Sequence, residues 1–289
     1  MRGLAMIDGW LRPRVPVARL DAVRILVGAF ALVYLVVRFR YFADLSRHAP
    51  SELSPVGIAR ILSAPLPAWS TWTIAALAVA FGAAFVRGVR LRASAPAFFV
   101  ALLWVTTYRS SWGKILHSEN LVVLHVGILA IGAIASSRST GEDAEREAGW
   151  VLRTIAIVTV LTYLVAGVAK LRSGGAAWIS GEALGRWVAF DALRKIELGS
   201  LHSPLAAWLA SQRGLLRVLA IFALLVELGA PLALVSARAG RVWAALAWSF
   251  HAGVLATMAI GFFYPLAGVA FAAFFPVERL PIVRRLTGR

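Results

Sequence analysis

The sequence predicts an all-α protein, a polytopic transmembrane bundle of about eight spans with amphipathic helices at the membrane interface. Composition is the first indication. Of the 289 residues, 60% are hydrophobic and only 15% are charged, whereas about a quarter of an average soluble domain is charged. The second is that apolar segments recur along the whole chain. Since helices satisfy their own backbone hydrogen bonds in lipid, such segments indicate spanning helices.

Eight apolar segments are candidate spans, separated by polar or turn-forming residues. They lie near 22–39, 70–87, 93–109, 119–136, 151–170, 216–237, 242–259 and 263–278. Several are shorter than the roughly 20 residues of a full span. The first segment follows arginines but lacks a small-residue cleavage site, so it is expected to be a retained span and not a signal peptide. We expect one integral-membrane domain over 1–289, with its core at about 20–278 and no extramembrane domain.

Two long connections also contain apolar residues, at 40–69 and 171–215. In 171–215 the apolar and aromatic residues recur at helical spacing, which predicts helices lying in the membrane interface. Trp178, Trp187 and Trp208 are typical of the aromatic belt at the level of the lipid headgroups.

The chain is strongly basic, with a formal net charge of +16. The basic residues separate the apolar segments, a pattern of membrane anchoring and orientation and not of nucleic-acid binding. Their density in the tails and even-numbered loops predicts that both termini are cytoplasmic. Cysteine is absent, which excludes disulfides and thiolate chemistry. The histidines lack the spacing of metal ligands, so we expect no metal.

Five ionisable residues lie within or at the end of apolar segments: His117, His125, Lys170, Glu227 and His251. A charge at the centre of a bilayer costs roughly 2.5–3.5 kcal/mol. Such side chains therefore tend to face the interior of a helix bundle or a hydrated cavity.

Each of these residues has a structural and a functional interpretation. Lys170 could extend its amine into the headgroup layer, or it could be a partly desolvated base. Glu227 lies in mid-segment, where it needs a proton or a partner such as a histidine or lysine. His251 could pack in the bundle or face a cavity.

The same choice applies near the start of the fourth segment. If Ser118 caps a helix there, His117 is an interfacial polar residue. Asn120 follows His117 by three residues, so both side chains could face one side of the helix. His125, two turns further on, is expected to be a packed histidine.

Three sequence motifs, in order, resemble the HTTM (horizontally transferred transmembrane) family, which includes the membrane module of vitamin K-dependent γ-glutamyl carboxylases. The motifs are "WGKILHSENL", "YLVAGVAKLRSGGAAWISGEAL" and "ELGAPLAL" followed by "SFHAGVLATMAIGFFYPL". His117 and Ser118 match a His-Ser pair of the family, and Lys170 matches the lysine of its Ala-Gly-Val-x-Lys-Leu motif. Glu227 and His251 are 24 residues apart, as the corresponding acid and histidine are. The resemblance covers roughly residues 20–278.

This resemblance implies an oxygen-dependent oxidation or epoxidation of a reduced quinone, either menaquinol or vitamin K hydroquinone. Lys170 would be the catalytic base, and His117 would bond to a quinol oxygen. Other residues of the cofactor cavity would be His251, Glu227, Asn120 and Trp178.

A peptide substrate or partner protein is a further implication. The carboxylases, however, bind their peptide through a large extramembrane C-terminal portion, whereas here eleven residues follow the last predicted span. Peptide carboxylation is therefore the least supported part of the resemblance. The alternative function is a non-catalytic membrane scaffold or helper that binds lipid, quinone or a peptide partner. A shared pocket for Lys170, His117 and His251 would favour the enzyme.

Overall fold

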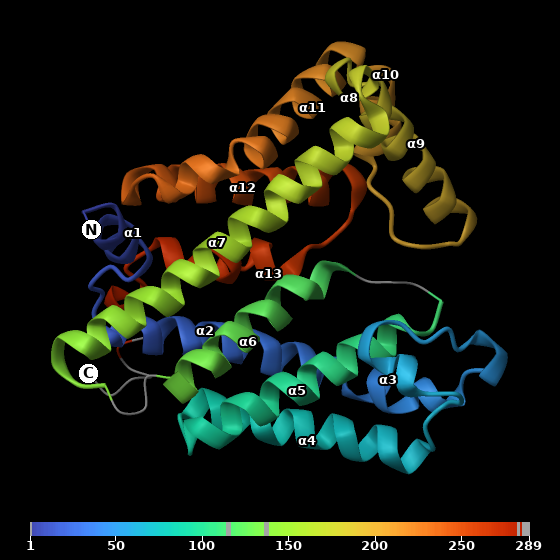
Figure 1. Cartoon of the computed structure of the whole chain (residues 1–289). Helices are drawn as coiled ribbons and strands as arrows, with labels where there is room; N and C mark the ends of the chain where they lie inside the picture. Colours follow the sequence, from blue (N-terminus) through green and yellow to red (C-terminus); the bar gives the residue numbers. More distant parts are fainter. Residues whose placement is uncertain (1, 114–116, 136–138, 282–283, 285–289) are drawn as a thin grey trace. The chain divides into compact units, whose positions relative to one another are not determined.

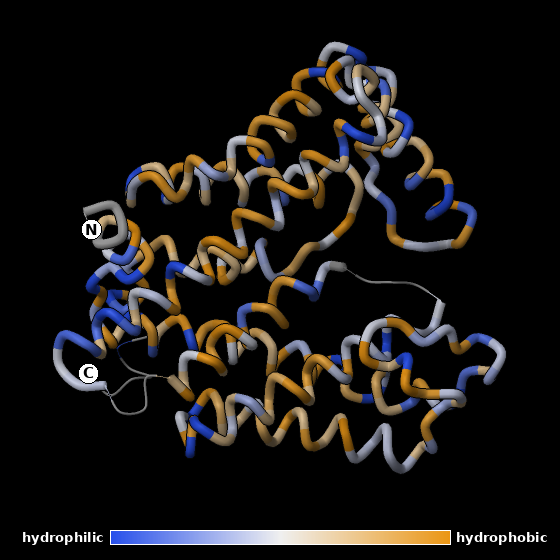
Figure 2. The backbone as a smooth tube through the Cα atoms, viewed as in Figure 1, coloured by the Kyte–Doolittle hydropathy of each residue, from blue (hydrophilic) through white to orange (hydrophobic). Residues whose placement is uncertain are grey.

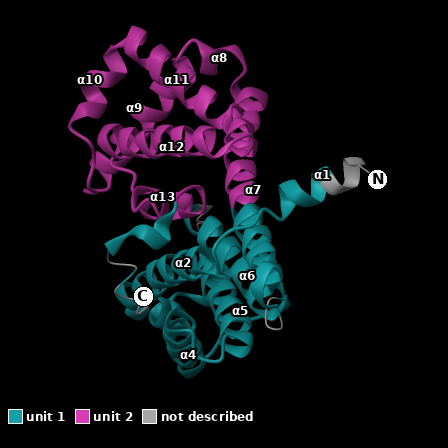
Figure 3. Ribbon diagram, turned by 90° about the vertical axis from the view of Figure 1, so that its left-hand side faces the viewer, with its two compact units in different colours: residues 1–155, 276–289 teal, residues 156–275 magenta. Residues whose placement is uncertain are grey.

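The computed structural model describes residues 2–113, 117–135, 139–281 and 284. Every regular element in these ranges is a helix, which confirms the all-α class (Figure 1). The chain divides into two compact units (Figure 3). Unit 1 comprises residues 1–155 and 276–289, and unit 2 comprises residues 156–275.

Unit 1 is built around four long or apolar helices that pack through small residues. Gly28 on α2 faces Phe85 on α4, and Gly82 on α4 faces Phe98 on α5, so close that a Cβ at either glycine would lie within 3.0 Å of the ring. The phenylalanine rings therefore fill the core of this unit. Its helices are α1 (Arg2–Leu11), α2 (Val17–Val37), α3 (Phe39–Ala43), α4 (Ala68–Arg87), α5 (Leu91–Ser110), α6 (Asn120–Ala135) and the first part of α7 (Gly141–Gly174).

Unit 2 begins within α7 and contains the candidate site. Its other helices are α8 (Ala176–Ile179), α9 (Glu182–Glu197), α10 (Leu205–Ser211), α11 (Arg213–Leu228), α12 (Ala237–Met258) and α13 (Phe263–Leu266). Helix α12 starts where the Ser236 hydroxyl accepts a hydrogen bond of 3.1 Å from the amide of Ala239. This N-cap satisfies one of the free amides at the helix start.

Four described helices, α2, α4, α5 and α7, are long and apolar enough to cross a membrane. Helices α10 and α11 are bent by 101° relative to each other, and they provide a fifth candidate span if the pair is treated as one broken span. The described residues therefore contain four or five candidate spans, fewer than the eight predicted. Figure 2 shows the hydrophobic residues of the chain in orange. Helix α6 has only 16 residues, and α12, with 22 residues, is less apolar than the four. The expected last span, 263–278, is instead a series of short helical turns.

The two long connections form short helices. Residues 40–69 contain the end of α3 and the 3₁₀ turns Asp44–Arg47, Pro50–Glu52 and Gly57–Ile61. Residues 171–215 contain α8, α9 and α10, which confirms the helices predicted there. Trp187 and Trp208 are each 56% exposed, as an aromatic belt requires, but Trp178 is 8% exposed. Trp178 therefore packs inside unit 2 and does not belong to such a belt.

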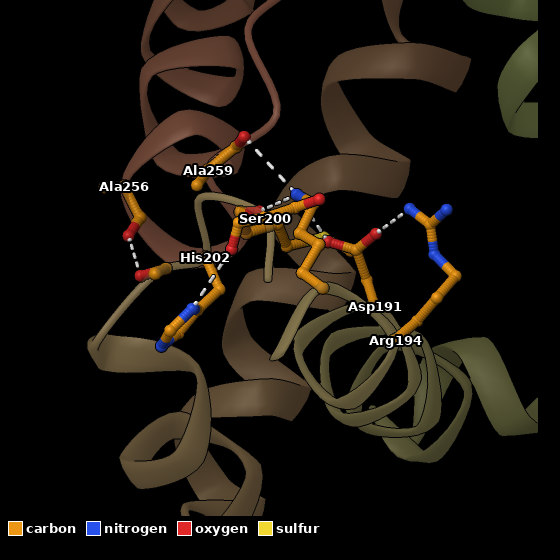
Figure 4. Close-up of polar contacts among 9 residues, drawn as sticks. Asp191, Arg194, Ser200, His202, Ala256 and Ala259 are labelled. Atoms are coloured by element: carbon orange, nitrogen blue, oxygen red, sulfur yellow. Dashed lines mark hydrogen bonds and ion pairs between the residues drawn. The ribbon is translucent and has the colours of Figure 1, made fainter. Parts of the chain in front are cut away.

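Polar contacts tie the end of α9 and the following loop to the end of α12 (Figure 4). The Lys195 ammonium donates a hydrogen bond of 2.6 Å to the carbonyl of Met258 and pairs with Asp191 at 2.8 Å. The hydroxyl of Ser203 donates to the carbonyl of Ala256 at 2.6 Å. The last carbonyls of a helix have no partner within it and carry partial negative charge. These donors therefore stabilise the C-terminus of α12.

Candidate functional site

An ion pair between Lys170 on α7 and Glu227 on α11 is the centre of the candidate site. The Glu227 side chain is 3% exposed and that of Lys170 is 22% exposed. A carboxylate this deeply buried requires a counter-charge or a proton. The structure thus supplies Lys170 as the partner, one of the alternatives that the sequence left open for Glu227.

Gly167, one turn before Lys170, allows α7 and α11 to approach each other. A Cβ at this position would lie 2.9 Å from the Cβ of Glu227 and 3.0 Å from the Cδ2 of Leu228. Real Cβ atoms are not found so close to other carbon atoms. A glycine is therefore required sterically at this position of the Ala-Gly-Val-x-Lys sequence. It allows the two helix backbones to come close together where the ion pair forms.

Two aromatic rings lie beside the ammonium group of Lys170. Its Nζ atom is 5.6 Å from the ring centroid of Trp178 and 5.8 Å from that of Phe250. Both distances allow cation–π attraction. The placement of Trp178 depends on Gly174, where a Cβ would lie 2.2 Å from the indole Cδ1. Lys170 is thus bound by one carboxylate within largely aromatic surroundings.

A tyrosine–histidine pair extends the polar cluster to α12. The hydroxyl of Tyr163, seven residues before Lys170, lies 2.7 Å from the Nε2 of His251, and both side chains are buried. The ring of Trp243 packs edge-on against Tyr163 at 5.0 Å. The Trp243 indole also donates a hydrogen bond of 2.9 Å to the carbonyl of Val226, the residue before Glu227. The cluster therefore joins α7, α11 and α12.

Two buried polar atoms of this cluster have no hydrogen-bond partner among the described residues: Oε2 of Glu227 and Nδ1 of His251. Leaving a buried polar group without a partner costs about 1–3 kcal/mol, so such atoms are rare in folded proteins. An ionised carboxylate oxygen only accepts hydrogen bonds, while a neutral imidazole has one donor and one acceptor nitrogen. Of the two atoms, the carboxylate oxygen can therefore only accept a further hydrogen bond, whereas the imidazole nitrogen can donate or accept one, depending on which ring nitrogen carries the proton.

The other predicted site residues belong to unit 1. His117 begins a 3₁₀ turn, His117–Glu119, and its side chain lies outside the described part of the structure. Asn120 is the first residue of α6 and is exposed. The hydroxyl of Ser118, the expected helix cap, donates to Glu119 at 2.7 Å, and Glu119 pairs with Arg109 at 2.9 Å. That His117 and Asn120 share a site with Lys170 stays a prediction.

His125 is completely buried within α6, in the packed position that the sequence predicts. Sequence reasoning gave no role to Tyr163 or Phe250. The sequence nevertheless contains a pattern that could have identified each of them. Tyr163 and Lys170 are seven residues apart, which places them on one face of a helix, and Phe250 directly precedes His251.

Comparisons of the chain with family models, with curated proteins and with solved structures give no match. The resemblance to the HTTM family therefore depends on the three motifs. Within the described residues, no group of three or more His, Asp or Glu side chains is arranged to bind a metal ion.

Proposed function

We propose that the chain is an integral membrane enzyme similar to the vitamin K-dependent carboxylase-like HTTM proteins, which oxidises or epoxidises a quinol with oxygen. The observation that carries the proposal is the presence of two unpartnered buried atoms in one cluster, Oε2 of Glu227, which pairs with Lys170, and Nδ1 of His251. The site combines polar groups for a hydroxylated ring with aromatic walls. Bound there, a reduced menaquinone or vitamin K would supply the electrons for the reaction with oxygen.

The free carboxylate oxygen gives a reason for selecting the reduced ligand. Oε2 of Glu227 can accept a hydrogen bond from a quinol hydroxyl, whereas the carbonyl oxygens of an oxidised quinone have no hydrogen to donate. Nδ1 of His251 can bond to a ligand oxygen or hydroxyl, depending on which imidazole nitrogen carries the proton. The site should therefore bind the quinol more tightly than the quinone. The role that the resemblance implies for His117, a bond to a quinol oxygen, stays a prediction, because its side chain lies outside the described residues.

Lys170 can act as a base only after it loses its proton. Its carboxylate partner is the acceptor at hand, because the two groups are hydrogen-bonded and the Glu227 side chain is buried. Transfer of the Lys170 proton to Glu227 would leave a free amine, and this amine could then accept the quinol proton.

The ion pair also favours a second function. Lys170 and Glu227 connect α7 to α11, and Trp243 connects α11 to α12. A non-catalytic membrane scaffold or helper, binding lipid, quinone or a peptide partner, would need the same contacts. Both functions place the protein in the cell membrane, and we propose cytoplasmic termini from the distribution of basic residues.

Turnover distinguishes these functions. Membranes that contain the protein would be incubated with reduced menaquinone or vitamin K and oxygen, and quinone epoxide would be measured. Lys170→Ala should lower the rate at least 100-fold, which is in the range of effects of a positioned base. Epoxide formation at equal rates in the wild type and in Lys170→Ala would refute the assignment of the base.

Lys195→Ala is the matched control. Lys195 also lies in unit 2, is partly buried and pairs with an acid, Asp191. Its ammonium donates to the carbonyl of Met258, however, and not to an atom of the candidate site. The control should keep most of the activity. A complete absence of epoxide in the wild type, with a normally folded protein, would favour the scaffold.

A further inference from the structure

The tight turn between α4 and α5 exposes three arginines. Arg87 is the last residue of α4, Arg90 directly precedes α5, and Arg92 lies in the first turn of α5. Among the residues that the structure describes, none of these three side chains forms an ion pair or a hydrogen bond. Residues 87–92, called here the basic turn, therefore carry three positive charges for which the described fold supplies no counter-charge.

The shape of the basic turn is fixed by contacts within unit 1. Gly88 and Arg90 have left-handed backbone conformations, with φ values of 74° and 44°, and this conformation is uncommon for a residue that has a Cβ. The largely buried guanidinium of Arg24 on α2 donates a hydrogen bond of 3.0 Å to the carbonyl of Val86, and it pairs with Asp21 at 3.6 Å. The three arginines are therefore presented by a turn that the packing of α2 against α4 holds in place.

The basic turn lies where a membrane would have its phospholipid headgroups. It connects α4 and α5, which are both long and apolar enough to cross a membrane. Val89, within the turn, is apolar and 51% exposed, which suits the boundary between headgroups and acyl chains. Since α2 and α4 are both candidate spans, the turn lies on the same side as the N-terminus, for which we propose the cytoplasm. The cytoplasmic leaflet is the one that carries a negative surface potential.

We propose that the basic turn binds the headgroup phosphate of an anionic phospholipid. A guanidinium group can donate two parallel hydrogen bonds to a phosphate. Each arginine close to an anionic membrane surface strengthens binding about fivefold. A choline headgroup brings its own positive charge to the arginines, so a zwitterionic lipid fits less well. The acyl chains would lie along the apolar surfaces of α4 and α5. This site is independent of the quinol reaction.

The test measures lipid binding to the full-length protein in detergent micelles by native mass spectrometry. The protein would be titrated with phosphatidylglycerol and with phosphatidylcholine of the same acyl chains. Phosphatidylglycerol should bind at least tenfold more tightly, and equal affinities would overturn the proposal.

Two soluble competitors identify the kind of ligand. Glycerol 3-phosphate has a phosphate but no acyl chains, and polyglutamate represents an acidic protein segment. Each should displace phosphatidylglycerol at least tenfold less well than unlabelled phosphatidylglycerol does. Equal displacement by either competitor would show a site for a soluble anion or an acidic peptide and would refute the lipid.

Two double variants locate the binding site. Arg87→Gln/Arg92→Gln should weaken the binding of phosphatidylglycerol at least tenfold, because two of the three charges are lost. Arg14→Gln/Arg146→Gln is the matched control: it removes the same charge from the surface of unit 1, but each of these arginines already pairs with an acid. The control should weaken binding less than about threefold. An equal loss in both variants would contradict the site, since only the net charge would then matter.

Arg90→Gly separates the loss of charge from damage to the fold. Glycine adopts a positive φ without a steric penalty, so this variant should keep the shape of the turn and the thermal midpoint of the wild type. It should nevertheless bind phosphatidylglycerol about fivefold more weakly. An unchanged affinity would overturn the site of three arginines.

Discussion

Replacing Lys170 by methionine should destabilise unit 2, because Glu227 would lose its counter-charge while its side chain stays 3% exposed. Removing one partner of a buried ion pair costs about 3–5 kcal/mol. We expect a value near the lower end, about 3 kcal/mol, because Lys170 is 22% exposed and water can reach its position. Methionine keeps an unbranched apolar side chain that can pack against Trp178 and Phe250.

The double variant Lys170→Met/Glu227→Leu should recover most of this loss. It removes both charges, and replacing a buried ion pair by apolar side chains of similar volume is often neutral. The free energy of unfolding would be measured in mixed micelles by denaturing-detergent titration followed by circular dichroism. Arg14→Gln is the control for an exposed pair with Glu142, with an expected cost of about 0–1 kcal/mol. Equal losses in the single and double variants would refute the buried ion pair.

Two further predictions concern the close approach of α7 to α11 at Gly167 and the ion pair between Arg19 and Glu278 in unit 1. Gly167→Ala should cost about 1–3 kcal/mol, because its Cβ would meet Glu227 at 2.9 Å. Gly253→Ala, in open space, should be neutral or stabilising by up to about 1 kcal/mol; the same detergent titration measures both. Partial burial raises the pKa of Glu278, but hydrogen bonds from Arg19 outweigh it and hold that pKa below its usual value. The pair therefore stabilises the fold at neutral pH and loses this effect as the pH falls through the folded-state pKa. Arg19→Gln should lower the thermal midpoint at neutral pH, and this shift should shrink as the pH falls below the usual glutamate pKa of about 4.3; a shift of the same size at neutral and at acidic pH would contradict this.

The sequence predicts the helices well because apolar segments fix their positions. It places the start of the fifth span at 151, whereas α7 begins at Gly141. The charged residues of its first turns hide the helix from a search for apolar segments, although Glu142 and Asp143 suit a helix N-terminus. It also counts too many spans. Near Pro265 and Gly268 the chain forms short turns, since proline and glycine interrupt regular helix.

The candidate site is predicted in part. Lys170, Glu227, His251 and Trp178 are recognised from the sequence, the first three because charged or polar groups are costly in apolar segments. The sequence leaves the partner of Glu227 open between a proton, a histidine and a lysine, because the choice depends on how α7, α11 and α12 pack. The role of Tyr163 and the two unpartnered atoms become visible only when every hydrogen bond is assigned.

The most direct test of the account compares the binding of a quinol with that of its dimethyl ether, which has the same ring but no hydroxyl hydrogens. Both ligands would be titrated into the protein in nanodiscs, for the wild type and for Lys170→Met/Glu227→Leu. A hydrogen bond to a charged group contributes about 1.5–3 kcal/mol, so the wild type should bind the quinol at least tenfold more tightly. In the double variant this preference for the quinol should fall at least severalfold, because the only bond that could still distinguish the two ligands is that of His251. Equal affinities in the wild type would contradict the binding of a quinol hydroxyl by Glu227.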